Sequence, residues 1–265
     1  MKGERLRSVR VNPTIESLFY DYIKDDFAEY FFFHVDYAQY PKDTEIYMAL
    51  DDNNKIHGMI LIWKNRRLQL RGSNESLELL LNEELYTPIS VTGFEDHKEI
   101  ITRYFPDYTK EIAMYRMSLK KGEQKDFEKY PYEILKEANR KDIALFMRNA
   151  DPIYWGSRSL EDILMDENNK WFGILKNGKL ICVTAVWNYQ NVGYITVVGT
   201  DPDHWNKGFA SSLVSSVLRE MFQDKEQALI TVRIKNDPAV HTYKKLGFSI
   251  RNTQYSFERD PFIKK

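Results

Sequence analysis

Two short stretches in the second half of the chain carry residues whose types and spacing suit the binding of an anion and the transfer of a proton. The first is TDPDHWNKGFASSL, Thr200 to Leu213, which lies between an apolar run and an amphipathic run. The second is TVRIKNDPAVHTYKKLGF, Thr231 to Phe248, in which Asn236 precedes Tyr243 by seven residues. A loop before a helix can hold a phosphate, and a phenol can donate a proton to a departing group.

The first stretch is predicted to lead from a strand into the N-terminus of a helix. The first N–H groups of a helix lack partners within it and lie at the positive end of its dipole. Gly208 would let a phosphate approach the backbone, and Lys207 can add positive charge. The stretch lacks the spacing of a P-loop and of the dinucleotide fingerprint. Taken alone, a loop with one glycine is equally typical of an ordinary turn.

The second stretch is predicted to run from a strand into a helix. We expect Asp237 to be the N-cap, Pro238 the first helical residue and Gly247 the end of the helix. Asn236 then lies at the end of the strand and Tyr243 near the end of the helix. A tyrosine in such a place is either a core residue of a buried helix face or part of a site.

The elements around these stretches repeat an order that also occurs in the first half. NNKIHGMILIWKN, residues 53–65, and KNGKLICVTAVWNY, residues 176–189, each predict a turn and a strand, with Lys and Trp eight residues apart in both. Each continues with a strand-like run, a helix, a strand and a helix that has a tyrosine near its end. This match favours an internal duplication over the chance similarity of α/β chains. Only the second half contains the insertion DPDHWNKGFA.

Length and composition indicate a folded α/β chain with enough apolar residues for sizeable cores, since 43% of the 265 residues are hydrophobic. Residues 119–131, LKKGEQKDFEKYP, are charged and poor in aliphatic side chains, so we expect a linker there. The predicted domains are residues 1–122 and 130–265. A formal net charge of −1 gives no long-range positive field, which argues against a nucleic acid or an anionic membrane as partner.

Cysteine and histidine usage argues against a metal centre. Cys182 is the single cysteine, and the five histidines are scattered without a ligand-like pair, so we expect no metal and no disulfide within the chain. The N-terminal residues lack the apolar core of a signal peptide, and no apolar run approaches the roughly 20 residues that cross a bilayer. We therefore expect a cytoplasmic protein.

The second half of the chain resembles the GCN5-related N-acetyltransferase (GNAT) family. The loop motif of the family, Q/R-x-x-G-x-G/A, is matched by Gly208 and Ala210, with Trp205 at the place of Q/R. Its later motif, N…A…Y…GF, is matched by Asn236, Ala239, Tyr243, Gly247 and Phe248. Two motifs in the right order are far more specific than either alone.

The resemblance implies an α/β fold with two GNAT-like mixed-sheet domains in tandem, each a central twisted sheet flanked by helices. The N-terminal domain would be a degenerate copy that lacks the coenzyme loop. The C-terminal domain would be an N-acetyltransferase that uses acetyl-CoA as co-substrate, without a metal. Its acceptor would be a primary amine of a small molecule or peptide. The alternative is a non-catalytic acyl-CoA-binding sensor or scaffold protein.

Site residues follow from the same resemblance. Tyr243 matches the tyrosine that donates a proton to the departing thiolate. Thr231 stands where some relatives place a glutamate base, so the base is left open among Asp201, Asp203, His204 and a water chain. The loop 149–162 would carry part of the acceptor site, or simply pack. The expected coenzyme-binding residues are Val198, Gly199, Thr200, Asn206, Lys207, Gly208, Phe209, Ala210, Ser211 and Asn236.

Overall fold

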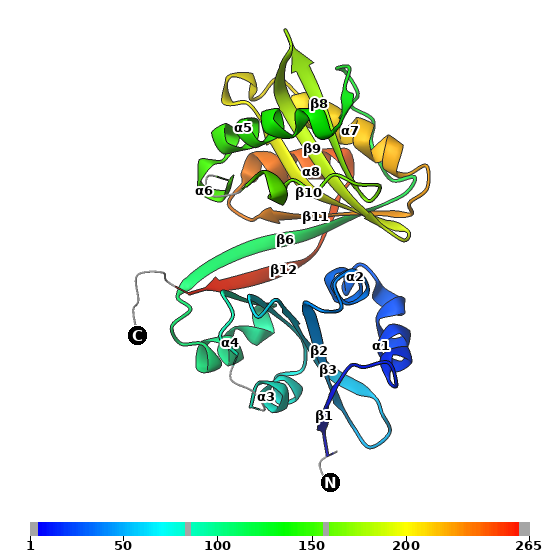
Figure 1. Ribbon diagram of the computed structural model, residues 1–265, viewed down its shortest axis with the longest axis vertical. Helices are drawn as coiled ribbons and strands as arrows, with labels where there is room; N and C mark the ends of the chain where they lie inside the picture. Colours follow the sequence, from blue (N-terminus) through cyan, green and yellow to red (C-terminus); the bar gives the residue numbers. More distant parts are fainter. Residues whose placement is uncertain (1–4, 83–85, 156–158, 260–265) are drawn as a thin grey trace. The chain divides into compact units, whose positions relative to one another are not determined.

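The computed structural model describes residues 5–82, 86–155 and 159–259, except for the side chains of residues 153 and 154 (Figure 1). The chain divides into two compact units. Unit 1 comprises Met1–Met114 and Asn252–Lys265, and unit 2 comprises Tyr115–Arg251. Both are mixed α/β units, in agreement with the expected fold class.

Unit 1 is built on antiparallel strands with one parallel pair at β4 and β5. Its strand order is β1-β2-β3-β4-β5, and the end of β12 pairs antiparallel with β5. The elements are β1 (Arg7–Arg10), α1 (Glu16–Ile23), η1 (Lys24–Asp26), α2 (Phe31–Gln39), β2 (Thr44–Leu50), β3 (Ile56–Trp63), β4 (Arg67–Gly72), α3 (Asn74–Asn82), β5 (Ser90–Gly93), η2 (Glu95–His97) and α4 (Lys98–Tyr104).

Unit 2 has the strand order β11-β10-β9-β8-β7, with β10 and β11 parallel and the other pairs antiparallel. The elements are β7 (Glu133–Leu135), η3 (Glu137–Asn139), α5 (Arg140–Ala150), α6 (Pro152–Trp155), η4 (Leu160–Asp162), β8 (Asn169–Lys176), β9 (Lys179–Tyr189), β10 (Val192–Thr200), η5 (Pro202–His204), α7 (Phe209–Met221), β11 (Gln227–Arg233) and α8 (Asp237–Leu246).

Two further strands, β6 (Lys110–Lys120) and β12 (Ser249–Glu258), each contain residues of both units. The end of β12 adjoins β5, while β6 is the sheet neighbour of β11. The last strand of the first half, β6, therefore ends in unit 2. The last strand of the second half, β12, ends in unit 1. Apart from short 3-10 turns, the order β-α-α-β-β-β-α-β-α-β runs from β1 to β6 and again from β7 to β12.

Helices α7 and α8 pack with the sheet of unit 2 around one apolar core. On α7 the residues that enter this core recur at helical spacing, which explains the amphipathic pattern of the sequence. They include Leu213, Val214, Val217, Leu218 and Met221. A second core in unit 2 forms beneath α5 and includes Ile143, Phe146 and Met147.

Residues 123–129, which the sequence assigns to a linker, lie within unit 2 and pack on α7. The backbone N–H of Phe127 donates to Ser215 Oγ over 2.9 Å, and that of Lys129 donates to Ser212 Oγ over 2.9 Å. Glu128 pairs with Arg219. The serines of α7 thus act as acceptors for this segment.

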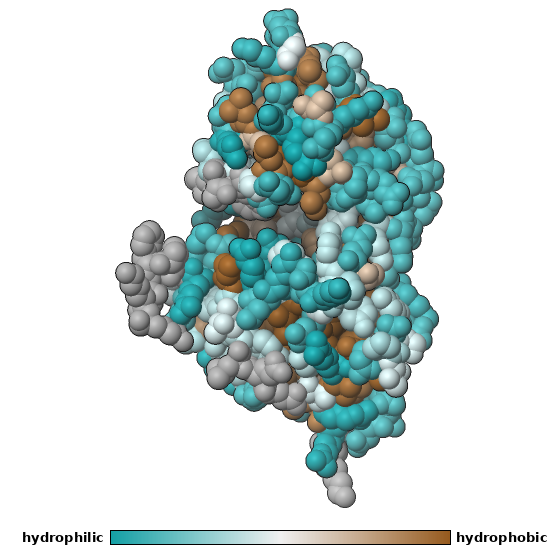
Figure 2. All heavy atoms as spheres, in the orientation of Figure 1, coloured by the Kyte–Doolittle hydropathy of each residue, from teal (hydrophilic) through white to brown (hydrophobic). Residues whose placement is uncertain are grey.

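Hydrophilic residues cover most of the face shown in Figure 2, with hydrophobic residues between them. In the part of the chain that the structure describes, no helix is long and apolar enough to cross a membrane. The same residues contain no group of three or more His, Cys, Asp or Glu side chains placed to hold a metal ion.

Candidate functional site

Strands β10 and β11 begin as a parallel pair and then part. Their register runs from Val192 opposite Gln227 to Ile195 opposite Ile230. Beyond this point β10 continues to Thr200, still paired with β9, and β11 continues to Arg233. Because backbone groups on an unpaired strand edge can bond a ligand, the fork can accept an extended amide-bearing chain.

A bulge in β10 accompanies the fork. The register with β9 shifts between Ile195 and Val197. After the bulge, Gly199 lies against α5, because a Cβ placed there would approach Phe146 to 3.1 Å and Met147 Sδ to 3.3 Å. Bulges turn a strand locally and interrupt its pairing, which is how two parallel strands come to separate here.

The loop 201–208 joins β10 to α7 and ends in a run of unpaired donors. Within the described parts of the chain, the N–H groups of residues 206 to 211 donate to no protein acceptor. The first paired one is Ser212 N–H, which donates to Gly208 O over 3.0 Å. Gly208 is the N-cap of α7 and has no side chain that could satisfy these donors. Six consecutive unpaired donors at a helix N-terminus are able to bind an anion. They belong to Asn206, Lys207, Gly208, Phe209, Ala210 and Ser211.

The conformation of Gly208 explains why glycine stands there. Its φ is +83°, in the left-handed region that residues with a Cβ rarely adopt. A Cβ added at this position would meet nothing within 4 Å. From the sequence alone, Gly208 is explained by the close approach of a phosphate. In the structure, its left-handed backbone conformation is by itself a reason for glycine at this position.

Three side chains of the loop form hydrogen bonds with its own backbone or with the end of β10. Asp201 Oδ1 accepts a hydrogen bond from Asp203 N–H over 2.8 Å, and Lys207 Nζ donates to Asp203 O over 2.7 Å. The exposed Trp205, at the Q/R position of the family motif, donates its indole N–H to Thr200 O over 2.8 Å. Trp205 therefore ties the loop to the end of β10. Of the open base candidates, Asp201 is engaged in capping η5.

Tyr243 lies on α8 inside the core of unit 2, with only 5% of its surface exposed. Its ring packs against Phe248 at 6.0 Å between centroids. Burial is the main cause that raises the pKa of the Tyr243 phenol, and the neighbouring Cys182 raises it further. Cys182 Sγ in turn lies 3.3 Å from Thr200 Oγ1 at the end of β10. The tyrosine is thus a core residue in the neighbourhood of the end of β10.

Asn236, and not Asp237, is the N-cap of α8, so this detail of the sequence interpretation was wrong. Asn236 Oδ1 accepts a hydrogen bond from Ala239 N–H over 3.3 Å, and Pro238 follows within the first turn. The amide oxygen does what the carboxylate was expected to do, because both are strong N-cap acceptors. Its expected contact with the coenzyme stays a prediction.

Tyr194 and Thr231 form a hydroxyl pair at the fork that the sequence interpretation missed. Tyr194 Oη donates to Thr231 Oγ1 over 2.6 Å. Thr231 is the first residue of β11 beyond the last paired position. No sequence signal could join these residues, since their strands are neighbours only in the folded sheet.

The expected acceptor loop 149–162 is only partly described. Arg158 lies outside the described residues, as does the side chain of Tyr154. Trp155 is 5% exposed and stacks edge-on against Trp171 at 6.4 Å. The sequence left open whether this loop forms part of the acceptor site or simply packs. Trp155 packs in the core.

The place in unit 1 that corresponds to the fork is closed. Phe94 N–H donates to His97 Nδ1 over 3.1 Å, and His97 Nε2 lies 2.9 Å from Gly72 O, so the ring bridges the ends of β5 and β4. Arg71 is buried there, 2.7 Å from Glu29 Oε1 and with its guanidinium 4.5 Å from the Phe94 ring centre. The Arg71–Glu29 ion pair, the Phe94 ring and the His97 imidazole therefore occupy the space at the ends of β4 and β5.

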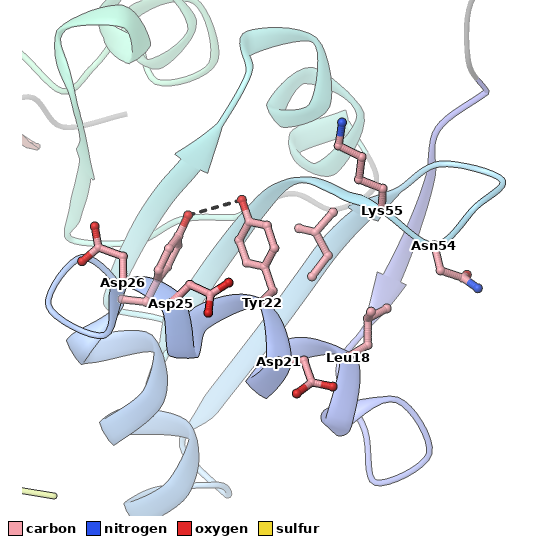
Figure 3. Close-up of a pocket in the computed structure, with 9 residues that line it drawn as sticks. Leu18, Asp21, Tyr22, Asp25, Asp26, Asn54 and Lys55 are labelled. Carbon is pink, nitrogen blue, oxygen red and sulfur yellow. Dashed lines mark hydrogen bonds between the residues drawn. The ribbon is translucent and has the colours of Figure 1, made fainter.

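Unit 1 also has a cavity of about 520 Å³, shown in Figure 3. The hydroxyls of Tyr22 and Tyr30 lie 3.4 Å apart in its wall. None of the predicted site residues lines it. The lining residues are Leu18, Asp21, Tyr22, Asp25, Asp26, Tyr30, Asn54, Lys55 and Ile56.

Comparison with known proteins agrees with the geometry of unit 2. The sequence model of the Acetyltransferase (GNAT) family matches residues 130–248. Residues 130–248 belong to the GNAT family. The match to this GNAT domain includes the fork, the loop, α7, α8 and Tyr243, and it does not include unit 1.

A mycothiol acetyltransferase from Saccharomonospora viridis is 37% identical to the chain over 67 residues. This segment is 25% of the chain and spans 22% of the length of that relative. It shows similarity to an acetyltransferase but is too short to carry over the activity of the whole protein.

Solved structures share the fold along nearly the whole chain. A Drosophila protein has a TM-score of 0.68 at 14% identity, over 97% of this chain and 99% of its own. A GNAT-family acetyltransferase from Colwellia psychrerythraea has a TM-score of 0.59 at 12% identity, over 97% and 100%. The likeness of fold therefore extends to residues of unit 1.

Proposed function

We propose that the chain is an acetyl-CoA-dependent N-acetyltransferase whose active site lies in the GNAT domain of unit 2. The observation that carries the proposal is the run of six unpaired N–H groups, residues 206–211, directly after a strand that has parted from its neighbour. Such donors suit a pyrophosphate, and the open strand edge suits the amides of a pantetheine arm. Acetyl-CoA contains both.

The coenzyme would lie along the fork with its arm on Val198, Gly199 and Thr200. Its pyrophosphate would accept hydrogen bonds from the loop and from the first turn of α7. Lys207 is placed in that loop but donates to Asp203 O, so it contributes charge from a fixed position. Asn236 would contact the arm from the end of β11.

The reaction would proceed by direct attack. The amine nitrogen bonds to the thioester carbonyl carbon, an oxyanion forms and is stabilised by a backbone N–H near Val198, and the C–S bond then breaks. Tyr243 donates its proton to the departing thiolate. The amine nitrogen gives up one proton to a base or water chain, and one proton returns to the Tyr243 phenolate. Overall, one proton leaves the nitrogen and the thiol gains one.

Burial keeps the Tyr243 phenol protonated and opposes a covalent role for Cys182. The raised pKa keeps the phenol protonated at neutral pH, so its O–H can donate a hydrogen bond to the sulfur as the C–S bond breaks. Burial also raises the pKa of the Cys182 thiol to about 12, so it remains a thiol at neutral pH. A thiol is a poor nucleophile, which favours direct transfer over an acyl-cysteine intermediate.

Unit 1 would be a second copy that does not bind the coenzyme. Its element order repeats that of unit 2, but Ser73 alone separates β4 from α3, where residues 201–208 separate β10 from α7. Ser73 Oγ accepts from Ser76 N–H over 3.3 Å and so takes a donor that unit 2 leaves open. The His97 bridge closes the corresponding fork.

Binding of acetyl-CoA can be tested with two matched glycine variants. Gly208→Glu places a carboxylate at the phosphate site, and we expect it to abolish the rise in melting temperature that acetyl-CoA causes in wild type. Gly178→Glu is the control, because Gly178 also has a positive φ, +76°, and open space around its Cβ position. A full shift in Gly208→Glu would show that the coenzyme binds elsewhere.

Trp205 and Thr231 depart from the family motif, so a non-catalytic sensor or scaffold stays an alternative. A measurement of turnover separates an enzyme from that alternative. Free thiol release from acetyl-CoA is measured with a panel of small-molecule and peptide amines. We expect at least one amine to accelerate release. Binding without release across the panel would instead favour the non-catalytic alternative.

A further inference from the structure

Tyr130, which belongs to neither family motif, is bonded to the loop that precedes α7. Its hydroxyl donates to Lys207 O over 2.9 Å. Its ring lies over Phe209, the first residue of α7, with centroids 4.1 Å apart and planes inclined by 30°. One side chain thus contacts the residue before Gly208 and the residue after it.

The backbone of Tyr130 is itself fixed on α7. Ser212 Oγ accepts hydrogen bonds from Lys129 N–H over 2.9 Å and from Tyr130 N–H over 3.0 Å. Ser212 lies on the first turns of the same helix and is fully buried. The tyrosine therefore reaches the loop from a support that does not move independently of the helix.

Peptide geometry gives this contact a consequence. In a trans peptide the C=O and the following N–H point in opposite directions. Because the Lys207 carbonyl bonds Tyr130, the N–H of Gly208 must point away from Tyr130. That N–H lies in the middle of the six unpaired donors.

We propose that Tyr130 is a positioning residue for the pyrophosphate of acetyl-CoA. It holds the Lys207–Gly208 peptide in the orientation that presents the Gly208 N–H to the phosphate oxygens. It acts through the loop and does not touch the reacting atoms. The inference rests on the proposed function, since it assumes that the coenzyme binds at this loop.

Tyr132 provides a matched control on the same segment. Its hydroxyl donates to Glu220 Oε1 over 2.8 Å, near the other end of α7. Tyr130→Phe and Tyr132→Phe each remove a hydroxyl that bonds this segment to α7 or to the loop before it, and the Tyr132 hydroxyl also interacts with Arg219. Only the first of these bonds reaches the phosphate-binding loop.

The test compares dissociation constants of acetyl-CoA and S-acetylpantetheine, measured by calorimetry and by ligand-observed NMR. S-acetylpantetheine has the thioester and the arm but no pyrophosphate. We expect Tyr130→Phe to weaken acetyl-CoA binding about tenfold, the size expected for one hydrogen bond, and to leave S-acetylpantetheine unchanged. Tyr132→Phe should change neither constant.

Two results would overturn the inference while leaving the proposed function intact. One is a Tyr130→Phe protein that binds acetyl-CoA as wild type does, and the other is an equal loss for both thioesters. If wild type fails to bind acetyl-CoA, the proposed function and the inference fall together. Should Tyr130→Phe fold poorly, Ser212→Ala loosens the same support and must show the same selective loss.

Discussion

Tyr243 joins two properties that are separate in most residues, since it is a core side chain and the proposed proton donor. Its burial is complete enough that a structural role is certain. What marks it for chemistry is its neighbourhood, because Cys182 beside it contacts Thr200 at the end of β10. The family motif in the sequence could indicate Tyr243. Its burial could be seen only in the folded structure.

We predict that Tyr243→Phe lowers the rate of thiol release by about 10²-fold, the low end for loss of a general acid. The affinity for acetyl-CoA should stay near that of wild type, because the phenyl ring keeps the packing. Single-turnover kinetics with an accepted amine, together with a binding measurement, separate the two effects. Release at the wild-type rate would remove Tyr243 from the mechanism.

The raised pKa of Tyr243 also predicts a change of stability in alkaline solution. An unfolded tyrosine loses its proton near pH 10, whereas the folded one retains it, so the unfolded chain binds fewer protons above that pH. The free energy of unfolding therefore falls as the pH rises above about 10, by at most ~1.4 kcal/mol per pH unit from this group. Denaturant melts at pH 9 and pH 11 should show a smaller fall for Tyr243→Phe. Parallel curves for the two proteins would contradict this.

Cys182 allows a direct check of the buried strand pair around it. With its thiol pKa raised to about 12 and its surface fully buried, it should not react with an aromatic disulfide reagent in the native protein at pH 8. One thiol per chain should appear on addition of denaturant. Rapid native reaction would mean that β9 and β10 open, and it would revive an acyl-cysteine route.

At the scale of elements, two helix N-termini differ in the donors that they leave open, and on our proposal this difference determines which unit binds the coenzyme. Helix α7 starts at a left-handed glycine after an eight-residue loop, residues 201–208, and its first donors are open. Helix α3 starts one residue after β4, and Ser73 takes one of its donors. The sequence could predict this difference from the insertion alone.

Other features of the elements could not be predicted, for physical reasons. The packing of residues 123–129 on α7 depends on hydrogen bonds from backbone N–H groups to serine side chains that lie 83 and 88 residues away in the chain. The pair of Tyr194 and Thr231 depends on strand neighbours. Periodicity and turn signals describe local preferences and hold no information on such contacts.

The His97 bridge of unit 1 predicts a loss of stability in acid. Its Nδ1 accepts from Phe94 N–H, so the ring must be neutral, and burial is the main cause that lowers its pKa. As the pH falls below the ordinary histidine value of about 6.5, the unfolded chain takes up the proton first, and the free energy of unfolding decreases. His34 is half-buried, its pKa is lowered mainly by burial, and it adds to the effect.

His97→Gln tests that bridge, since an amide can accept and donate without titrating. We expect the drop in melting temperature between pH 7.5 and pH 5.5 to be smaller in His97→Gln than in wild type. His34→Gln provides the comparison for a half-buried histidine that does not bridge two strand ends. An unchanged pH dependence in His97→Gln would show that the bridge does not contribute.

For the whole molecule, the repeated element order and the shared strands β6 and β12 support the proposal of a duplicated chain in which one copy kept the coenzyme site. The similarity of the second half to the GNAT family could be predicted from the two motifs. The predicted domains, residues 1–122 and 130–265, stay a prediction. The exchange of the last strands could not, because β6 and β12 read as ordinary strands in the sequence. Their partners are fixed only when both units are folded.

The central claim is that acetyl-CoA binds along the fork of β10 and on the N-terminus of α7. The most direct measurement is an amide-resolved NMR titration of the full chain with acetyl-CoA. The account predicts the largest shifts for the amides of residues 196–200 and 206–211, with those of residues 67–76 in unit 1 unchanged. Shifts confined to unit 1, or none at saturating acetyl-CoA, would contradict it.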